Sequence, residues 1–295
     1  MKIHRSIPIV ALAIVSYLMV LQWNEDYGQA ELPAPVATLA ASSDLPETSP
    51  PTAVSDDVPT AVSSTGDAVS NTVAPVSDKL IRVQTDVFDL AIDPRGGDIV
   101  QLKLPLFPRR QDRPDVPFQL FNNDANQLYL AQSGLTGSNG PDARANGRPL
   151  YSASQSSYTL AEGQDELVVE LTFSEAGVNY LKRFSFKRGS YDLAVSYRID
   201  NQSSQVWSGN LFAQLKRDAS ADPSSSTATG SATYLGAALW TADKPYTKVS
   251  MSDMDSAPLK ENVQGGWVAW LQHYFVTAWI PAKDTANSVQ TRKDS

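Results

Sequence analysis

The longest apolar run of the chain lies near its N-terminus, where Ile7 to Leu21 holds no charged residue. Lys2 and Arg5 precede the run, and Glu25 and Asp26 follow it. An apolar core of about 15 residues has the length of a signal peptide, whereas a membrane-spanning helix needs about 20. The pattern therefore predicts a membrane-targeting segment, which is either a removable signal or a permanent anchor.

Two features indicate that residues 1–24 form an uncleaved transmembrane helix. Tyr17 and Trp23 carry amphipathic rings suited to the headgroup zone, so that Ile3 to Trp23 could just span a bilayer. The run is followed by bulky and charged residues, Gln22 to Asp26, instead of a small-residue cleavage site. With basic residues before the run and acidic ones after it, the positive-inside rule places the N-terminus in the cytoplasm. The chain after about residue 24 would then lie across the membrane.

The periodic pattern disappears in the next segment, residues 25–78. This part is rich in Ala, Pro, Ser, Thr, Val and Asp, and its prolines follow no regular spacing. A segment with so few large apolar residues and so many prolines cannot build a core or a regular helix. We predict a disordered linker, whose ends would lie about 40 Å apart if its ~50 residues behave as a flexible coil.

Alternation with period two begins near Lys79 and predicts a β-rich domain over residues 79–295. Leu80 to Asp93 reads as a half-buried strand with a phase change near Val87, which indicates a bulge or a break. Pro94 to Asp98 has the composition of a turn, and alternation resumes from Val100 to Leu104. These residues predict a hairpin.

Three further alternating segments cover residues 167–173, 178–186 and 191–199, and Gly-containing turns at 175–177 and 187–190 separate them. Consecutive strands of this kind form an antiparallel meander with one apolar face. No helical pattern of comparable length is present. We therefore expect a mainly β domain with two packed sheets and one extended core.

The most hydrophobic stretch after the N-terminus runs from Gly265 to Pro281 and holds three of the six tryptophans. It predicts a central strand or strand pair that is apolar on both faces, and it is too short and too interrupted to span a membrane. His273, within it, is the single histidine beyond the N-terminal run. One histidine could act as a general base, but in an aromatic strand it is more often a hydrogen-bonded core residue.

Three loop-like segments carry polar side chains that could suggest chemistry. Pro105 to Pro117 holds an arginine cluster mixed with acids, which is typical of solvated surface; Gly134 to Pro149 holds Arg144 and Arg148 in a glycine-rich connection without phosphate-loop spacing; and Asp218 to Gly230 holds serines without a nucleophile elbow. We assign no catalytic, cofactor-binding or metal-ligating residue, and the sequence does not predict an enzyme.

Composition narrows the possible functions further. The chain has 295 residues, a net charge of −8 and no cysteine, which excludes disulfides, thiolate catalysis and Cys-ligated zinc. Nine acidic residues and no basic one lie between Asn24 and Asp78, so the folded part is close to neutral. We expect no nucleic-acid partner, because the basic footprint of nucleic-acid binding is missing.

Several segments together resemble the YidC family of bacterial inner-membrane protein insertases, and the resemblance covers essentially the whole chain. They are the run Ala11 to Tyr17, the acidic Ala/Pro/Ser linker, Ile92 to Ile99, Arg183 to Phe186 and, above all, Gly266 to Pro281. In Gram-negative members, the family has a first transmembrane helix, a disordered linker and a periplasmic domain of β-supersandwich fold, similar to galactose mutarotases. A conserved five-helix membrane core follows these parts.

The resemblance implies a membrane insertase and chaperone of the bacterial inner membrane, with membrane lipid, nascent membrane proteins and the Sec translocon as partners. After Pro281 this sequence offers only Ala282 to Ser295 and no further span. It is thus expected to be an N-terminal fragment with an incomplete periplasmic domain. None of the family's groove residues can be carried over to a position here.

Two other interpretations remain open. The mutarotase-like fold suggests a periplasmic carbohydrate-binding or mutarotase-like protein, but mutarotases pair His with Glu and only His273 is present as a candidate. A secreted β protein with a cleaved signal is the plainer alternative. The resemblance favours the anchor over the cleaved signal.

Overall fold

A computed structural model describes residues 17, 19, 80–145, 147–222 and 234–293 of the chain. Tyr17 and Met19 are helical, and the rest of the predicted anchor and the whole predicted linker lie outside the described residues. Among the residues that are described, no helix combines the length and the apolar character needed to cross a bilayer.

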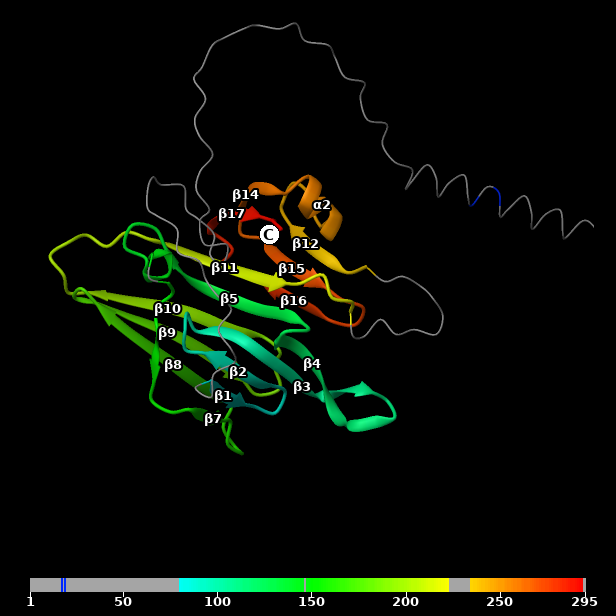
Figure 1. The fold of residues 1–295 in the computed structure, drawn as a ribbon, viewed down its shortest axis with the longest axis horizontal. Coiled ribbons are helices and arrows are strands. Elements are labelled where there is room, and N and C mark those ends of the chain that lie inside the picture. The colour runs from blue at the N-terminus through cyan, green and yellow to red at the C-terminus, as the bar shows by residue number, and fades with distance from the viewer. Residues whose placement is uncertain (1–16, 18, 20–79, 146, 223–233, 294–295) are drawn as a thin grey trace, which may run out of the picture. The chain divides into compact units, whose positions relative to one another are not determined.

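Seven strands form the largest sheet, called here the seven-stranded sheet (Figure 1). Every pair in it is antiparallel except β1 with β7, which run parallel. In spatial order its strands are β11 (Asn210–Arg217), β5 (Leu128–Thr136), β4 (Arg113–Asn123), β3 (Asp98–Arg110), β2 (Asp89–Asp93), β1 (Ile81–Gln84) and β7 (Ser157–Thr159).

The predicted break near Val87 and the predicted hairpin are both confirmed. Between β1 and β2 the hydroxyl of Thr85 accepts hydrogen bonds from the backbone N–H groups of Val87 (3.2 Å) and Phe88 (2.9 Å), which turns the chain. Between β2 and β3, Gly96 and Gly97 adopt φ of 77° and 67°, a region that glycine enters without steric cost.

The prolines of Pro105 to Pro117 suggested a loop, and this prediction is wrong. The segment forms the outer half of the β3–β4 hairpin. Arg110 and Arg113 pair with Asp112 and Asp115 on its exposed surface, as expected of solvated charges. The prolines are tolerated because this part of the hairpin extends beyond the rest of the sheet, where fewer ladder hydrogen bonds are needed (Figure 1).

The predicted meander is confirmed and forms a second sheet, called here the meander sheet. Its order is β10 (Leu193–Asn201), β9 (Val178–Lys187), β8 (Glu166–Glu175) and β6 (Ser152–Ala153), all antiparallel. The turn from β8 to β9 uses Ala176 and Gly177, both at positive φ. Alternate residues of β9 are buried, as period two requires.

The prediction of two packed sheets is incomplete, because the C-terminal part adds two further sheets. A four-stranded C-terminal sheet has the order β13 (Thr247–Ser250), β12 (Gly236–Trp240), β15 (Trp267–Leu271) and β16 (Val276–Trp279). A separate two-stranded ribbon pairs β14 (Lys260–Gln264) with β17 (Ala286–Gln290). The helix α2 (Met251–Ser256) begins with a capping box, and the short 3₁₀ helix η2 (Pro141–Ala143) follows β5.

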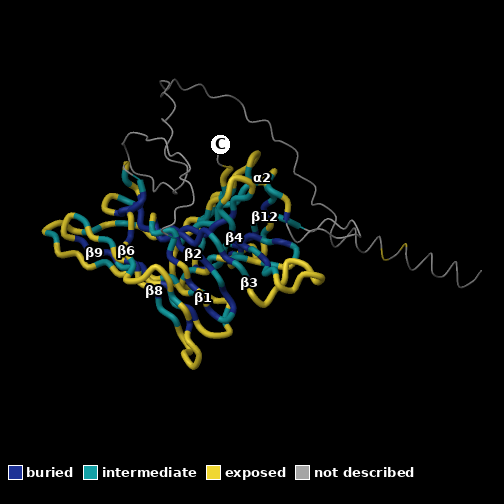
Figure 2. The backbone as a smooth tube through the Cα atoms, turned by 60° about the horizontal axis from the view of Figure 1, so that its bottom comes forward, coloured by how far each residue is buried: buried dark blue, intermediate teal, exposed yellow. Residues whose placement is uncertain are grey.

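The stretch from Gly265 to Pro281 forms the predicted strand pair, β15 and β16, with β15 inside its sheet and β16 at the edge. The prediction that both of its faces are buried is wrong, because Val276 and Ile280 are exposed. The main core lies where the seven-stranded sheet and the meander sheet pack together, and Trp270 of β15 joins it. Buried positions run through the strands, and the turns are exposed (Figure 2).

Candidate functional site

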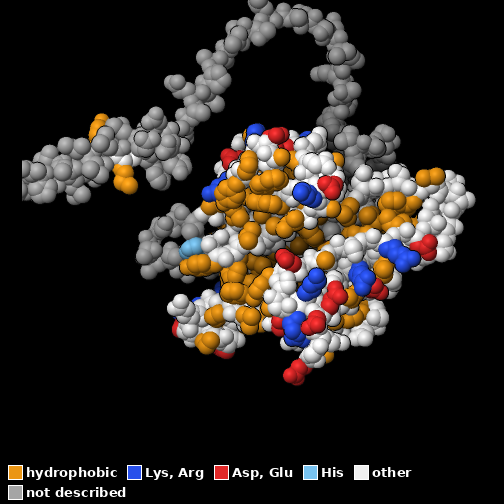
Figure 3. Space-filling model, turned by 180° about the vertical axis from the view of Figure 1, so that it is seen from behind, with side chains coloured by type: hydrophobic (Ala, Val, Ile, Leu, Met, Phe, Trp, Pro, Cys, Tyr) orange, Lys and Arg blue, Asp and Glu red, His pale blue; other side chains and the backbone are white. Residues whose placement is uncertain are grey.

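An apolar groove of about 2320 Å³ opens on the described part of the chain. Its walls include β10, an edge strand of the meander sheet, β11, an edge strand of the seven-stranded sheet, and the strands β14 to β17. Hydrophobic side chains gather around a hollow on the face seen in Figure 3. Exposed apolar surface of this extent marks an interaction face more often than ordinary surface.

The alternation of the strands explains why apolar side chains face the groove. Leu211 of β11, Val276 of β16 and Ile280, which directly follows β16, are 64%, 63% and 71% exposed. Opposite phases of these strands carry the buried Phe212 and the half-buried Trp279. The exposed phase of each strand, with Leu211 and Ala213 on β11 and Val276 and Ala278 on β16, is therefore apolar and left uncovered among the described residues.

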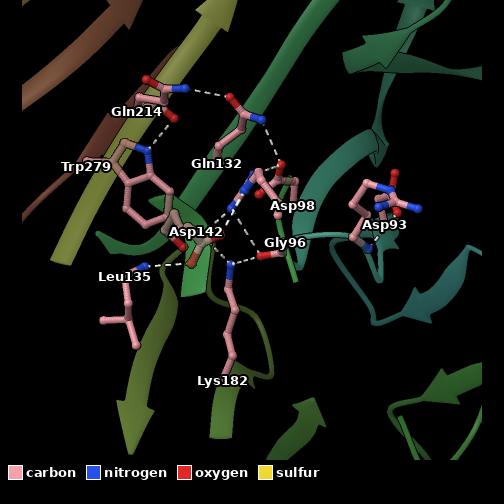
Figure 4. A network of polar contacts seen from close by, with 12 residues as sticks. Asp93, Gly96, Asp98, Gln132, Leu135, Asp142, Lys182, Gln214 and Trp279 are labelled. Carbon is pink, nitrogen blue, oxygen red and sulfur yellow. Dashed lines mark hydrogen bonds and ion pairs between the residues drawn. The ribbon is translucent and has the colours of Figure 1, made fainter. Parts of the chain in front are cut away.

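A buried charge cluster surrounds Arg148, and Figure 4 shows its members Asp98, Asp142 and Lys182. The Arg148 guanidinium donates to the carboxylate of Asp142 (2.9 Å) and also pairs with Asp98. It donates further to the backbone carbonyls of Ser133 (2.9 Å) and Gly96 (3.3 Å). All three charged side chains are at least nine-tenths buried, so each charge needs its partners to offset the loss of water.

Lys182 of β9 reaches the same place from the meander sheet. Its ammonium group donates to the carbonyls of Gly96 (3.0 Å) and Ser133 (2.9 Å), and the side chain is fully buried. Burial lowers the pKa of Lys182 to about 7, against the opposing effect of the nearby carboxylate of Asp98. The cluster thus connects the two sheets through side-chain to backbone hydrogen bonds.

Local sequence makes room for the cluster. A Cβ at Gly134 would lie 2.5 Å from the carboxylate carbon of Asp142, and a Cβ at Gly96 would lie 2.3 Å from the Arg148 guanidinium. Pro141 opens η2 and so places Asp142, whose Oδ2 accepts the N–H of Leu135 at 2.7 Å. Gly96 and Gly134 therefore leave space for the charged side chains. Gly134 to Thr136 was predicted as part of a connection but belongs to β5.

A chain of hydrogen bonds leads from the cluster towards the C-terminal sheet (Figure 4). The Gln132 amide donates to Asp98 (2.7 Å), the Gln214 amide donates to Gln132 (2.6 Å), and the indole N–H of Trp279 donates to the backbone carbonyl of Gln214 (3.0 Å). Gln214 and Trp279 also line the groove, so hydrogen bonds connect the groove wall with the charge cluster.

The arrangement suits binding and mechanical connection better than chemistry at a substrate. The charged groups of the cluster are buried and mutually paired, so they cannot reach a molecule in the groove without rearrangement. Within the described residues no group of three or more His, Cys, Asp or Glu side chains could hold a metal ion.

Residues 80–295 match the family model described as the YidC periplasmic domain. The chain belongs to the YidC family. It is 68% identical over 298 residues to "Membrane protein insertase YidC" of Azotobacter vinelandii (strain DJ / ATCC BAA-1303), an alignment that covers 100% of this chain and 53% of the relative. The protein of the same name from Pseudomonas putida (strain GB-1) has the same identity and coverage. The YidC protein of Pseudomonas syringae pv. tomato (strain ATCC BAA-871 / DC3000) is 66% identical over 299 residues, with 100% and 53% coverage. The chain spans about half the length of the curated relatives it matches.

His273 lies in the turn between β15 and β16, not within a strand. Its ring stacks on Tyr274 with centroids 4.0 Å apart, and its backbone N–H donates to Asp222 (2.7 Å). Its buried Nδ1 has no hydrogen-bond partner among the described residues, so the side chain is not the hydrogen-bonded core histidine that the sequence suggested. It lines a shallow pocket of about 380 Å³ together with Tyr234 and Tyr246.

The serine-containing segment from Asp218 to Gly230 is described only as far as Asp222. Asp218 accepts the N–H of Leu128 at 2.8 Å and so ties the end of β11 to the start of β5. The sequence predicted neither the buried role of Arg148 nor that of Lys182. A signal for Lys182 was present, because it occupies the inward phase of its strand between Tyr180 and Phe184, both of which are buried.

Proposed function

We propose that the chain supplies the membrane anchor and the periplasmic module of a membrane-protein insertase and chaperone of the bacterial inner membrane. The observation that carries this proposal is the identity of 66% to 68% across the whole chain to proteins named Membrane protein insertase YidC. The match of residues 80–295 to the YidC periplasmic domain supports it. Insertion itself would need the other half of the longer relatives.

In this proposal residues 1–24 anchor the chain with the N-terminus in the cytoplasm, residues 25–78 form a linker, and residues 79–295 form a periplasmic domain of β-supersandwich fold. The positive-inside arrangement of Lys2 and Arg5 supports the orientation. Partners would be inner-membrane lipid, nascent membrane proteins and the Sec translocon. The apolar groove is the surface of the domain best suited to such contacts.

A chimera tests the insertase proposal directly. The chain is joined to the remaining C-terminal part of the Azotobacter vinelandii relative and expressed in cells depleted of their own insertase. We expect the chimera to restore growth and insertion of membrane proteins as well as the intact relative does, and the 295-residue chain alone to restore neither. Failure of a stably expressed chimera to support insertion would contradict the proposal.

Topology can be tested separately, because the chain contains no cysteine. Single substitutions Ser6→Cys and Ser77→Cys are exposed to a membrane-impermeant maleimide in cells with a permeabilised outer membrane. We expect labelling at position 77 and none at position 6 until the inner membrane is disrupted. Recovery of a mature chain without its first residues would instead support a cleaved signal.

A carbohydrate-binding function is the second candidate, and the observation in its favour is the pocket lined by Tyr234, Tyr246 and His273. Aromatic rings of this kind often stack on sugar rings. Isothermal titration calorimetry with hexoses decides the question. Saturable heat that disappears in His273→Ala would favour sugar binding over the insertase module.

A further inference from the structure

The contact between the seven-stranded sheet and the C-terminal sheet contains buried donors that lack acceptors. The Arg217 guanidinium of β11 lies 5.1 Å from the ring centroid of Tyr129 on β5 and 5.8 Å from that of Trp270 on β15. Within the described residues, Nε and Nη1 of Arg217 and Nε1 of Trp270 are buried without a hydrogen-bond partner. Each such group loses its hydrogen bonds to water and gains none in return.

Arg217 is half-buried, and the groups around its guanidinium compensate only weakly for the water that Nε and Nη1 have lost. Nη2 donates to the carbonyl of Ser220 at 3.3 Å, and the two rings provide cation–π contacts. Desolvation lowers the pKa of Arg217, and Asp222 and Asp218 only partly oppose this effect. The closed contact is therefore less favourable for this side chain than a hydrated one would be.

Backbone connections do not hold the two sheets together at this contact. Among the described strands, no ladder joins β15 or β16 to the seven-stranded sheet. Each interaction across the contact involves a side chain. The Trp279 indole donates to the Gln214 carbonyl, and the His273 backbone N–H donates to the Asp222 carboxylate. The ring of Phe275 stacks on that of Phe118, with centroids 4.3 Å apart. Such a contact can separate without breaking either sheet.

We propose that this contact, defined by Arg217, Tyr129 and Trp270, is a hydratable joint at which the C-terminal sheet opens and closes against the seven-stranded sheet. Opening lets water reach the unpartnered N–H groups, which offsets the apolar contacts that are lost. Because β11 and β16 both line the groove, opening changes the width of the groove. The joint is a conformational device of the fold and does not depend on the proposed function.

Double electron–electron resonance on spin-labelled protein tests the joint, since the chain has no native cysteine. Labels are attached at Leu211→Cys on β11 and Val276→Cys on β16, both exposed positions on opposite sides of the joint. A control pair, Glu170→Cys on β8 and Arg198→Cys on β10, lies within the meander sheet. We expect two distances, a closed and an open one, for the first pair and one narrow distribution for the control.

Whether the unpartnered donors stabilise the open state is tested by removing them. Arg217→Met combined with Trp270→Phe keeps apolar volume and removes all three N–H sites. We expect the open population to fall about fivefold or more, since a single unsatisfied buried donor can shift an equilibrium by about that factor. Trp270→Phe alone serves as the milder variant if the double variant does not fold, and it should shift the population in the same direction.

Two results would overturn the proposal. One is a single distance for the Leu211/Val276 pair that is as narrow as the control. The other is an open population that stays the same, or grows, when the donors are removed, because water at Arg217 and Trp270 would then not be what stabilises the open state.

Discussion

Two arginines connect the sheets of this domain, and their surroundings differ in almost every respect. Arg148 meets two carboxylates and two backbone carbonyls at the contact between the seven-stranded sheet and the meander sheet. Arg217, at the contact with the C-terminal sheet, meets one carbonyl and two aromatic rings. The same side chain is thus fully paired at one contact and weakly paired at the other, and its partners determine how much a buried arginine contributes.

The largest effect is expected from Arg148→Met. The substitution leaves Asp98 and Asp142 buried without their main counter-charge, and breaking a buried ion pair in this way costs about 3–5 kcal/mol. Urea unfolding of the domain measures the change in the free energy of unfolding. Arg188→Met, which removes an exposed arginine, is the matched control and should change it by less than about 1 kcal/mol.

Lys182→Met should have a smaller effect near neutral pH. The carbonyls of Gly96 and Ser133 keep their hydrogen bonds from Arg148, and the variant no longer buries an ammonium group. We expect a loss of about 1–2 kcal/mol at pH 7, which is the net value of one or two hydrogen bonds. A loss as large as that of Arg148→Met would show that the lysine, not the arginine, holds the cluster together.

The difference in stability between the wild-type protein and Lys182→Met should depend on pH. Because the pKa of Lys182 is lowered to about 7 in the folded protein, the unfolded chain binds more protons at this residue between pH 7 and about 10. The wild-type protein should therefore gain stability relative to Lys182→Met as the pH rises through this range, by up to about 1.4 kcal/mol per pH unit. A difference that stays constant from pH 7 to 9.5 would mean that the lysine keeps its proton.

The smallest effect is expected from Arg217→Met. The variant loses two cation–π contacts and one weak hydrogen bond, but it also removes two buried N–H sites without acceptors. These contributions oppose each other, so the free energy of unfolding should change by no more than about 1 kcal/mol. A cost similar to that of Arg148→Met would erase the difference between the two contacts.

The strands of the first half could be predicted because their side chains alternate and their turns hold glycine. The β1–β2 break, the β2–β3 hairpin and the meander all lie where period two is clean. The outer β3–β4 hairpin was missed because proline normally excludes a ladder, and here the strands extend beyond the sheet.

The charge cluster could not be predicted as a unit, because its members come from segments that approach each other only in the folded state. Arg148 lies in a glycine-rich segment, where an arginine is ordinarily solvated. Only Lys182 carried a local signal, a charged residue in the inward phase of a strand. Such a break in an apolar pattern indicates a buried partner elsewhere in the chain.

The position of Lys182 also imposes an order of events on the growing chain. It lies 86 residues after Gly96 and 49 after Ser133, whose carbonyls it contacts. When the chain emerges from its N-terminus first, Asp98, Asp142 and Arg148 become available well before β9 does. Lys182 therefore joins the cluster late in synthesis, and the seven-stranded sheet is completed later still, because β11 follows β9 in the sequence.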